Sequence, residues 1–466
     1  MKGRSFERLI FLYFPWIIAT LFDGDPLLSY LIAWSGSFYI FFITLSGMIS
    51  PLPADRSFGN QIMRPLILVQ IIFAGYMCCT SIFYLLSLYG FNNFHQIPSY
   101  AVDTDKLAVT AQCQRYYSLG HAAMVSGILL FMHYKTERKY VVDEHKLLVF
   151  LFYATILTLP IASIFLYVPG LSQFANQFSS LSFMAAALGL AFSIFNKDLP
   201  KTAICFVFYG LNFYSALLSG FKEPIILSVL VLGVFLYPVY KKTVILVFIP
   251  VLVLLFFILP TYVGVIRSSN WSGDDDADAA SSEAISVALN KQDLADETTW
   301  DFLVNRFSEI DMFTGFVENT PARRPFYGTE LIEQSLMALV PRAFWPSKPS
   351  TEELVMNRVY DAGIVNPLSS VSAKPAFIVD AYLSGGGFGV FLYLFIYGAA
   401  AQLIAQKAEE LFGGYTLGTA LIFSGLFQIF WRGLSFEFIF NTVFWSLVSM
   451  YLLFLLVKRI GVIKKV

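Results

Sequence analysis

Long apolar runs separated by short polar segments dominate the chain. A membrane-spanning helix needs about 20 apolar residues to cross roughly 30 Å of hydrocarbon. Runs of about this length lie near 8–22, 27–50, 65–88, 116–134, 147–168, 177–196, 201–219, 225–239, 243–265, 376–402, 413–430 and 436–457. The pattern predicts an all-α polytopic membrane protein with about 12 transmembrane helices.

A single long hydrophilic stretch divides this pattern into three parts. Residues 1–265 hold spans one to nine, 266–375 form a large loop, and 376–466 hold spans ten to twelve and a tail. Within the loop, apolar residues recur at helical spacing over 299–319 and again over 327–340, which predicts amphipathic helices lying in the membrane interface. The acidic run 273–283 lacks the alternating spacing of a calcium loop, so we expect a solvated tip there and no metal site.

Lysine and arginine placement predicts the orientation. With the N-terminus inside, 18 of the 31 basic residues fall in inside segments and 4 in short outside loops, while the other 9 lie in the long loop. Cytoplasmic loops carry the excess of basic residues, and long translocated loops escape that rule. We therefore expect both termini to be cytoplasmic and the loop to be extracytoplasmic, as in a multi-pass protein of a bacterial cytoplasmic (inner) membrane.

The composition excludes several classes of protein. Hydrophobic residues make up 57% of the chain and charged residues only 14%, against about 25% charged in a soluble domain. This excludes a soluble enzyme, a disordered regulator and a nucleic-acid binder, and it makes membrane lipid a necessary partner. The four cysteines are too few and too scattered for a disulfide framework or a zinc site.

Basic residues that the predicted topology places on the outer face are the first candidates for substrate binding. Guanidinium groups bind phosphate oxygens bidentately, which suits a diphosphate leaving group. The alternative is that some of them only pair with carboxylates of the same loop, and that Lys222 only snorkels to the interface. The candidate diphosphate- or substrate-binding residues are Lys222, Arg267, Arg306, Arg323, Arg324, Arg342, Lys348 and Arg432.

One stretch of the loop is more specific. Pro341-Arg342-Ala343-Phe344-Trp345-Pro346-Ser347-Lys348-Pro349 resembles the "PR-x-hydrophobic-W-P-x-K-P" signature of Wzy-type O-antigen and oligosaccharide repeat-unit polymerases. Thr320-Pro321 followed by Tyr327-Gly328 is similar to another stretch of that family. Asp380 stands where the family pattern suggests glutamate, and Gly385–Gly387 holds one extra glycine. The motif resemblance covers 300–390.

The resemblance implies glycosyl transfer between two lipid-linked substrates. The growing glycan would leave undecaprenyl diphosphate and join the non-reducing end of a new lipid-linked repeat unit. The diphosphate bond supplies the energy, so no cofactor is implied, and such polymerases generally work beside a chain-length regulator protein. An acceptor hydroxyl needs a base, and the candidate catalytic residues are Asp380, Glu437 and Glu309, among which the sequence does not choose.

Three alternatives remain open. Related O-antigen ligases use a histidine in the large outer loop, and this loop has none, which favours a polymerase. Asp23 and Asp25 resemble the acidic pair of glycosyltransferases that use polyprenyl-phosphate sugars, although such residues are also common in ordinary turns. A polysaccharide flippase or other transporter would suit the number of spans. A transporter would carry charged or helix-breaking groups at mid-membrane.

Overall fold

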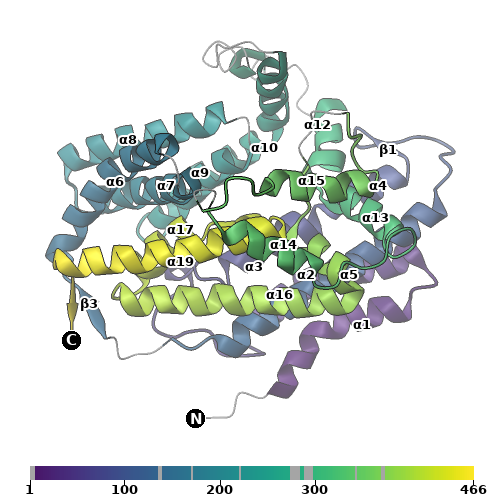
Figure 1. The fold of residues 1–466 in the computed structure, drawn as a ribbon, viewed down its shortest axis with the longest axis horizontal. Coiled ribbons are helices and arrows are strands. Elements are labelled where there is room, and N and C mark those ends of the chain that lie inside the picture. Colours follow the sequence, from purple (N-terminus) through teal and green to yellow (C-terminus); the bar gives the residue numbers. More distant parts are fainter. Residues whose placement is uncertain are drawn as a thin grey trace.

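The computed structural model describes most of the chain. The described residues are 6–134, 139–168, 172–219, 222–272, 284–287, 297–341, 344–368 and 373–466. Helices dominate them, as the apolar pattern predicted, and strands are confined to two short antiparallel pairs among the described residues (Figure 1).

The elements follow one another along the chain with few long connections. The α-helices are α1 (Phe14–Leu21), α2 (Pro26–Leu45), α3 (Leu68–Ile72), α4 (Ser81–Leu88), α5 (Thr104–Phe131), α6 (Glu144–Tyr167), α7 (Ser172–Phe195), α8 (Leu199–Leu218), α9 (Lys222–Leu236), α10 (Lys241–Ser272), α12 (Glu297–Phe302), α13 (Ile310–Asn319), α14 (Glu330–Leu339), α15 (Thr351–Asp361), α16 (Phe377–Leu411), α17 (Ser424–Leu426), α18 (Ile429–Arg432) and α19 (Phe436–Arg459). The 3₁₀-helices are η1 (Phe6–Tyr13) and η2 (Phe58–Asn60), and the π-helices are η3 (Phe73–Cys79), η4 (Leu303–Phe307) and η5 (Thr416–Phe423). Strand β1 (Phe91–Asn92) pairs with β2 (His95–Gln96), and β3 (Tyr140–Val142) pairs with β4 (Ile463–Lys465), both antiparallel.

Eight helices in the described part of the chain are long and apolar enough to cross a membrane, which is compatible with a multi-pass membrane protein. They are Pro26–Leu45, Leu68–Leu88, Lys146–Tyr167, Phe174–Phe195, Leu199–Leu218, Lys241–Ile266, Phe377–Leu411 and Phe436–Arg459. The other four predicted spans fall on shorter or more polar elements: 8–22 on η1 and α1, 116–134 on the C-terminal part of α5 and the residues after it, 225–239 mostly on α9, and 413–430 on η5, α17 and α18. The count of 12 therefore stays a prediction.

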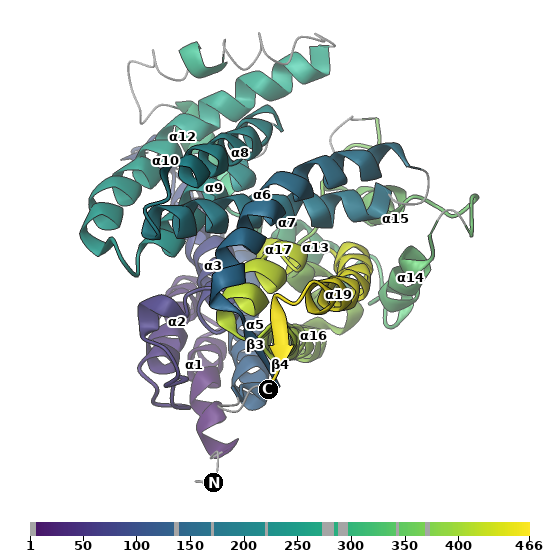
Figure 2. The ribbon, with the colours of Figure 1, turned by 90° about the vertical axis from the view of Figure 1, so that its left-hand side faces the viewer.

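Helices α5 and α16 pack closely because glycines face the neighbouring backbone. A Cβ atom on Gly127 would lie 2.2 Å from the Phe395 carbonyl oxygen, and one on Gly398 would lie 2.0 Å from that of Met124. Small residues allow such close approach between helices in apolar surroundings. Figure 1 shows α16 and α19 running side by side, with α6 and α8 at the upper left and α1 at the lower right, and Figure 2 shows α1 and α2 on the side away from α19.

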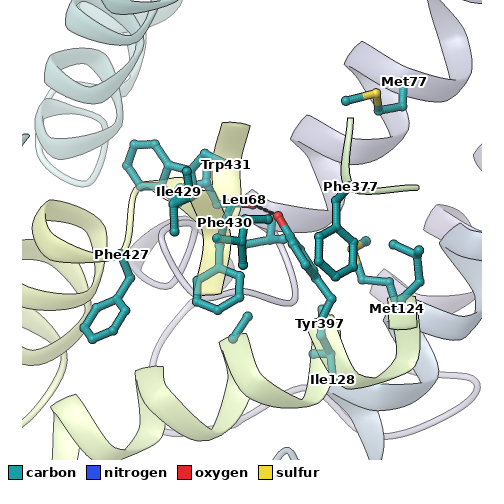
Figure 3. Packing of buried hydrophobic residues seen from close by; sticks show 14 of the residues in the cluster. Leu68, Met77, Met124, Ile128, Phe377, Tyr397, Phe427, Ile429, Phe430 and Trp431 are labelled. Atoms are coloured by element: carbon teal, nitrogen blue, oxygen red, sulfur yellow. Dashed lines mark hydrogen bonds between the residues drawn. The ribbon is translucent and has the colours of Figure 1, made fainter. Parts of the chain in front are cut away.

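The segment predicted as a span over 376–402 does not run straight. Gly386 has φ +61° and ψ −142°, a conformation that glycine adopts readily, and the chain reverses there. The rings of Phe377 and Tyr397 are consequently 4.7 Å apart, whereas 20 residues of continuous helix would separate them by about 30 Å. Figure 3 shows these two side chains side by side. Residues 377–384 are therefore a short helix folded back against the long helix that follows.

The reversed helix packs against the segment that precedes α19. Tyr397 Oη donates a hydrogen bond to the Phe430 carbonyl oxygen at 2.6 Å, drawn as a dashed line in Figure 3. The Phe377 amide donates to the Gly433 carbonyl oxygen at 2.6 Å. The start of α16 and the start of α19 are thereby held beside each other.

The loop helices differ in part from the prediction. The segment 299–319 is not one helix, because Ser308 is extended and its Oγ accepts a hydrogen bond from the Ile310 amide at 3.3 Å. A serine hydroxyl competes in this way with helical hydrogen bonds. The segment 327–340 forms α14, which packs along α19. The predicted acidic tip, 273–283, lies outside the described residues.

Candidate functional site

An arginine of the loop joins two carboxylates from the ends of two candidate spans. Arg358 on α15 donates through Nη1 to Glu437 Oε1 at 2.6 Å and through Nη2 to Glu437 Oε2 at 2.7 Å. Nη2 also donates to Asp380 Oδ2 at 3.1 Å. We call these three residues the Arg358 cluster. It fastens the loop to both α16 and α19.

The Arg358 cluster is enclosed by protein. The exposed fraction of the side chain is 2% for Arg358 and 0% for Asp380 and Glu437. Burial alone would lower the pKa of Arg358, but Asp380 and Glu437 raise it above its ordinary value, so the guanidinium stays charged. A buried charge is tolerated only when it is paired, and here one cation faces two carboxylates.

The hydrogen bonds of the Arg358 cluster are incomplete. Asp380 Oδ2 accepts a hydrogen bond from the Phe436 amide at 2.8 Å, in addition to the one from Arg358. Asp380 Oδ1 and Arg358 Nε have no hydrogen-bond partner in the structure. An unsatisfied buried polar atom is costly, by about 1–3 kcal/mol. Asp380 Oδ1 is therefore the carboxylate oxygen of the cluster that is left unsatisfied.

Local structure explains why these three side chains converge. Ser350 caps α15, its Oγ accepting from the Glu353 amide at 3.0 Å, so that Arg358 falls in the last turn of the helix. The reversal at Gly386 turns Asp380 back into the protein, and Ser384 Oγ donates to the Asp380 carbonyl oxygen at 2.9 Å. Glu437 lies in the first turn of α19.

Aromatic side chains from α5, from α13 and from the segment before α14 lie around Tyr382 on the reversed helix. The Tyr382 ring lies 5.0 Å from that of Tyr116 and 5.7 Å from those of Phe313 and Phe326. Tyr382 Oη donates to the Thr320 carbonyl oxygen at 2.7 Å. These contacts bind the loop segment around Thr320 to the helix that carries Asp380.

A family model matches residues 14–465, and it is described as a domain of unknown function, DUF8712. The chain belongs to this family. Neither the curated proteins nor the solved structures gave a significant match. The family description assigns no activity, so the argument for function rests on the residues themselves.

The structure brings two of the three predicted catalytic residues together. Asp380 and Glu437 share Arg358, as described above. Glu309 lies elsewhere, at the start of α13, where its carboxylate accepts a hydrogen bond from Tyr76 Oη. Glu309 therefore does not belong to the Arg358 cluster.

The predicted cations that lie in the described part of the chain have different surroundings. Arg306 on η4 and Arg323 are exposed. Arg324 is half-buried, pairs with Asp361 and Glu330, and lies 4.0 Å from the centre of the Tyr327 ring.

Two other predicted cations have structural partners. Lys348 Nζ donates to the carbonyl oxygens of Ala338 and Val340 at the end of α14, at 3.1 and 2.7 Å. Arg432 pairs with Glu223 at 3.0 Å. Arg342 and the side chains of Lys222 and Arg267 lie outside the described residues.

Arg358 itself was not among the predicted site residues, although the sequence carries a signal for it. Val355, Met356 and Val359 form the buried face of α15, and Arg358 lies on the same face. A charged residue at an apolar helical position is the mark of a buried ion pair. That signal was weak because α15 is short and the loop contains several other arginines.

The acidic pair after the first predicted span has structural contacts. Asp25 caps α2, its Oδ1 accepting from the Leu28 amide at 3.1 Å, and Asp23 pairs with Arg115 at 2.6 Å. Aspartate is a favoured helix N-cap. These contacts match the reading of Asp23 and Asp25 as an ordinary turn.

A second buried arginine cluster lies at the other end of α16. Arg64 donates to both oxygens of Glu409, at 3.0 and 2.9 Å, and to both oxygens of Asp55, each at 2.8 Å. Glu409 Oε1 also accepts from Thr419 at 2.7 Å, and the guanidinium lies 3.7 Å from the centre of the Tyr134 ring. We call Arg64, Asp55 and Glu409 the Arg64 cluster.

Proposed function

We propose that the protein is a polysaccharide polymerase that transfers a growing glycan between lipid diphosphates. The glycan would leave undecaprenyl diphosphate and join the non-reducing end of a new lipid-linked repeat unit. Two features support this: the resemblance of 341–349 to the Wzy-type signature, and the Arg358 cluster, where a loop arginine meets Asp380 and Glu437. The second feature carries the proposal.

The reaction would proceed as follows. The acceptor hydroxyl oxygen forms a bond to the anomeric carbon of the donor glycan, and the bond from that carbon to the diphosphate oxygen breaks. Asp380 Oδ1, which has no hydrogen-bond partner, would take the hydroxyl proton as general base. Loop cations such as Arg306, Arg323 and Arg324 would hold the negative charge of the leaving diphosphate.

The Arg358 cluster would have to open for this reaction, because its side chains are buried. α15 would move away from α16 and α19 when substrate enters, and the charged substrate groups would then replace part of the ion pairing. Glu437 would keep Arg358 charged and oriented through its two hydrogen bonds. In this role Glu437 is a positioning residue and Asp380 is the base.

The proposal includes the membrane topology. About 12 spans, both termini in the cytoplasm, and the loop on the outer face of a bacterial inner membrane would give the loop access to lipid-linked glycans. The loop segments 297–375 meet the starts of α16 and α19, whereas Arg64, β3 and β4 lie near the opposite end of α16. This separation agrees with the placement of basic residues.

Deletion of the gene in the native host, followed by gel analysis of surface and lipid-linked glycans, tests the proposal. Wild-type, Arg323→Ala and Lys242→Ala copies would be restored separately; Arg323 is exposed in the loop and Lys242 is exposed at the start of α10. A ladder that collapses to single repeat units and is rebuilt fully by wild type and Lys242→Ala, but poorly by Arg323→Ala, is expected. An unchanged ladder in the deletion strain contradicts the proposal, and long lipid-linked chains that never reach their final acceptor would identify a ligase.

The chain reversal at Gly386 favours one alternative, a flippase or other polysaccharide transporter. Discontinuous helices in apolar segments are typical of transporter binding sites, and the candidate span Phe377–Leu411 contains such a break. A transporter would leave lipid-linked repeat units trapped on the cytoplasmic side after deletion. A polymerase would leave them on the outer side, where an added glycosidase digests them.

A further inference from the structure

Helix α14 runs along α19 instead of lying across its end. The carbonyl oxygen of Leu339, the last residue of α14, accepts a hydrogen bond from Trp445 Nε1 at 3.3 Å. Near the other end of this segment, the Tyr327 amide donates to the Leu383 carbonyl oxygen on α16 at 2.9 Å. Figure 2 shows α14 beside α19, at the edge of the molecule.

This path takes the end of α14 well past the start of a candidate span. The span Phe436–Arg459 covers the whole of α19, and Trp445 lies nine residues from Phe436, or about 14 Å along the helix. The ring of Trp445 is also 5.2 Å from that of Phe174, the first residue of another candidate span on α7. The chain that follows α14 therefore starts alongside α19, next to the lateral surface that would face lipid.

The segment that follows α14 exposes aromatic side chains. Phe344 is 82% exposed and Trp345 37% exposed, and we call residues 344–348 the aromatic turn. On α19, Phe444 and Leu452 are exposed as well, and the Phe444 ring lies 5.1 Å from that of Trp445. In a membrane-spanning chain, exposed apolar side chains beside a span face lipid hydrocarbon.

Several backbone groups in and beside the aromatic turn are paired within the protein. The amides of Phe344 and Trp345 both donate to the Pro341 carbonyl oxygen, at 3.0 and 3.2 Å. Lys348 Nζ satisfies the last carbonyl oxygens of α14, and Pro346 has no amide hydrogen to satisfy. Backbone groups inside a bilayer must be paired within the protein.

We propose that α14 and the aromatic turn dip into the bilayer leaflet nearest the start of α19, with Phe344 and Trp345 in contact with lipid chains. The glutamates of its first turn, Glu330 and Glu333, would remain at the headgroup level. This goes beyond the interfacial helix that the sequence predicted, and it does not depend on the proposed enzymatic function. A transporter with this fold would carry the same element.

Spin labels on single cysteines test this placement. The full chain in phosphatidylcholine vesicles, with Cys79→Ser to remove the described native cysteine that is not fully buried, would carry Phe344→Cys, Glu353→Cys or Leu452→Cys. Glu353 is exposed on α15, and Leu452 is exposed along α19. Collision rates of each label with oxygen, which concentrates in lipid, and with a water-soluble nickel chelate would be compared by electron paramagnetic resonance.

The label at Phe344→Cys is expected to collide more often with oxygen than with the nickel chelate, as the Leu452→Cys label does. The Glu353→Cys label is expected to show the opposite preference. If the Phe344→Cys label instead matches Glu353→Cys while Leu452→Cys still reports lipid, the aromatic turn lies in water and the proposal is wrong. Since position 344 is exposed, substitution there should not impair folding.

Discussion

The Arg358 and Arg64 clusters have the same composition but differ in how completely their groups are paired. Each holds one arginine and two carboxylates, and each includes a carboxylate of α16. In the Arg64 cluster, Nε, Nη1 and Nη2 of the arginine and all four carboxylate oxygens take part in hydrogen bonds. In the Arg358 cluster, Arg358 Nε and Asp380 Oδ1 have no partner.

The two clusters also differ in their access to water. Asp55 is 26% exposed, and a cavity of about 1040 Å³ borders Asp55 and Glu409. All three side chains of the Arg358 cluster are buried. A fully paired cluster at an edge is suited to fastening helices together, whereas an enclosed cluster with unpaired polar atoms calls for another explanation. We therefore interpret the Arg64 cluster as an anchor and the Arg358 cluster as the functional site.

The largest expected effect follows from removing the enclosed cation. Arg358→Met should lower the free energy of unfolding by about 3–5 kcal/mol, because Asp380 and Glu437 would be left as buried like charges. Denaturant titration of the protein in detergent micelles measures this. The triple variant with Asp380→Asn and Glu437→Gln should recover most of the loss, and an Arg358→Met variant as stable as wild type would contradict the ion pairing.

Removing Arg64 from the other cluster should lower the free energy of unfolding less than removing Arg358. Arg64→Met should lower the free energy of unfolding by about 2 kcal/mol, because Asp55 can regain water and Glu409 keeps Thr419 as a partner. The same titration compares the two variants. Equal losses for Arg64→Met and Arg358→Met would show that the difference in enclosure has no energetic consequence.

The chain reversal at Gly386 separates the short first part of α16 from the long helix that follows. Alanine substitutions at Gly386 and at its neighbour Gly385 test this reversal. Gly386→Ala should destabilise the protein by about 1 kcal/mol, because alanine is strained at a φ of +61°, and its Cβ atom would also lie 3.2 Å from the Phe326 ring. Gly385→Ala should change the stability by less than about 0.5 kcal/mol, since its φ is −179° and no atom lies within 4 Å of the added Cβ. Equal effects in thermal unfolding would argue against the reversal.

The smallest expected effect is a pH dependence of the Arg64 cluster. The hydrogen bonds from Arg64 lower the pKa of Asp55 below its ordinary value of 3.8. Such a group stabilises the folded state above pH 3.8, and the stabilisation is lost as the pH falls through the lowered pKa. Wild type should exceed Asp55→Asn in stability by less than about 1 kcal/mol near neutral pH, and the gap should close below pH 3.8. A gap that widens in acid would contradict the pairing.

Much of the helical character followed from the sequence because apolar run length is a local property. The eight candidate spans lie within or overlap runs that the pattern identified. The reversal at Gly386 was not predicted, since a run of glycines only permits the required φ and does not impose it. For the same reason the pattern made 376–402 one straight span.

Two of the three members of the Arg358 cluster were among the predicted site residues, but their geometry was not predicted. Asp380 and Glu437 were chosen for their position near the mouths of spans, and both lie in the Arg358 cluster. Their shared partner was missed because Arg358 is 22 residues from Asp380 and 79 from Glu437, and only the fold brings them together. Arg432 and Lys348, chosen for their charge, bind a carboxylate and helix-end carbonyls respectively, which local sequence does not disclose.

The assignment of function to the Arg358 cluster and of anchoring to the Arg64 cluster is tested most directly by one pair of variants. Asp380→Asn and Glu409→Gln each neutralise one carboxylate of α16 without changing its shape, and each would be restored to the deletion strain at wild-type protein levels. The account predicts that Asp380→Asn leaves only single lipid-linked repeat units, whereas Glu409→Gln restores the full glycan ladder. A full ladder with Asp380→Asn would contradict the account.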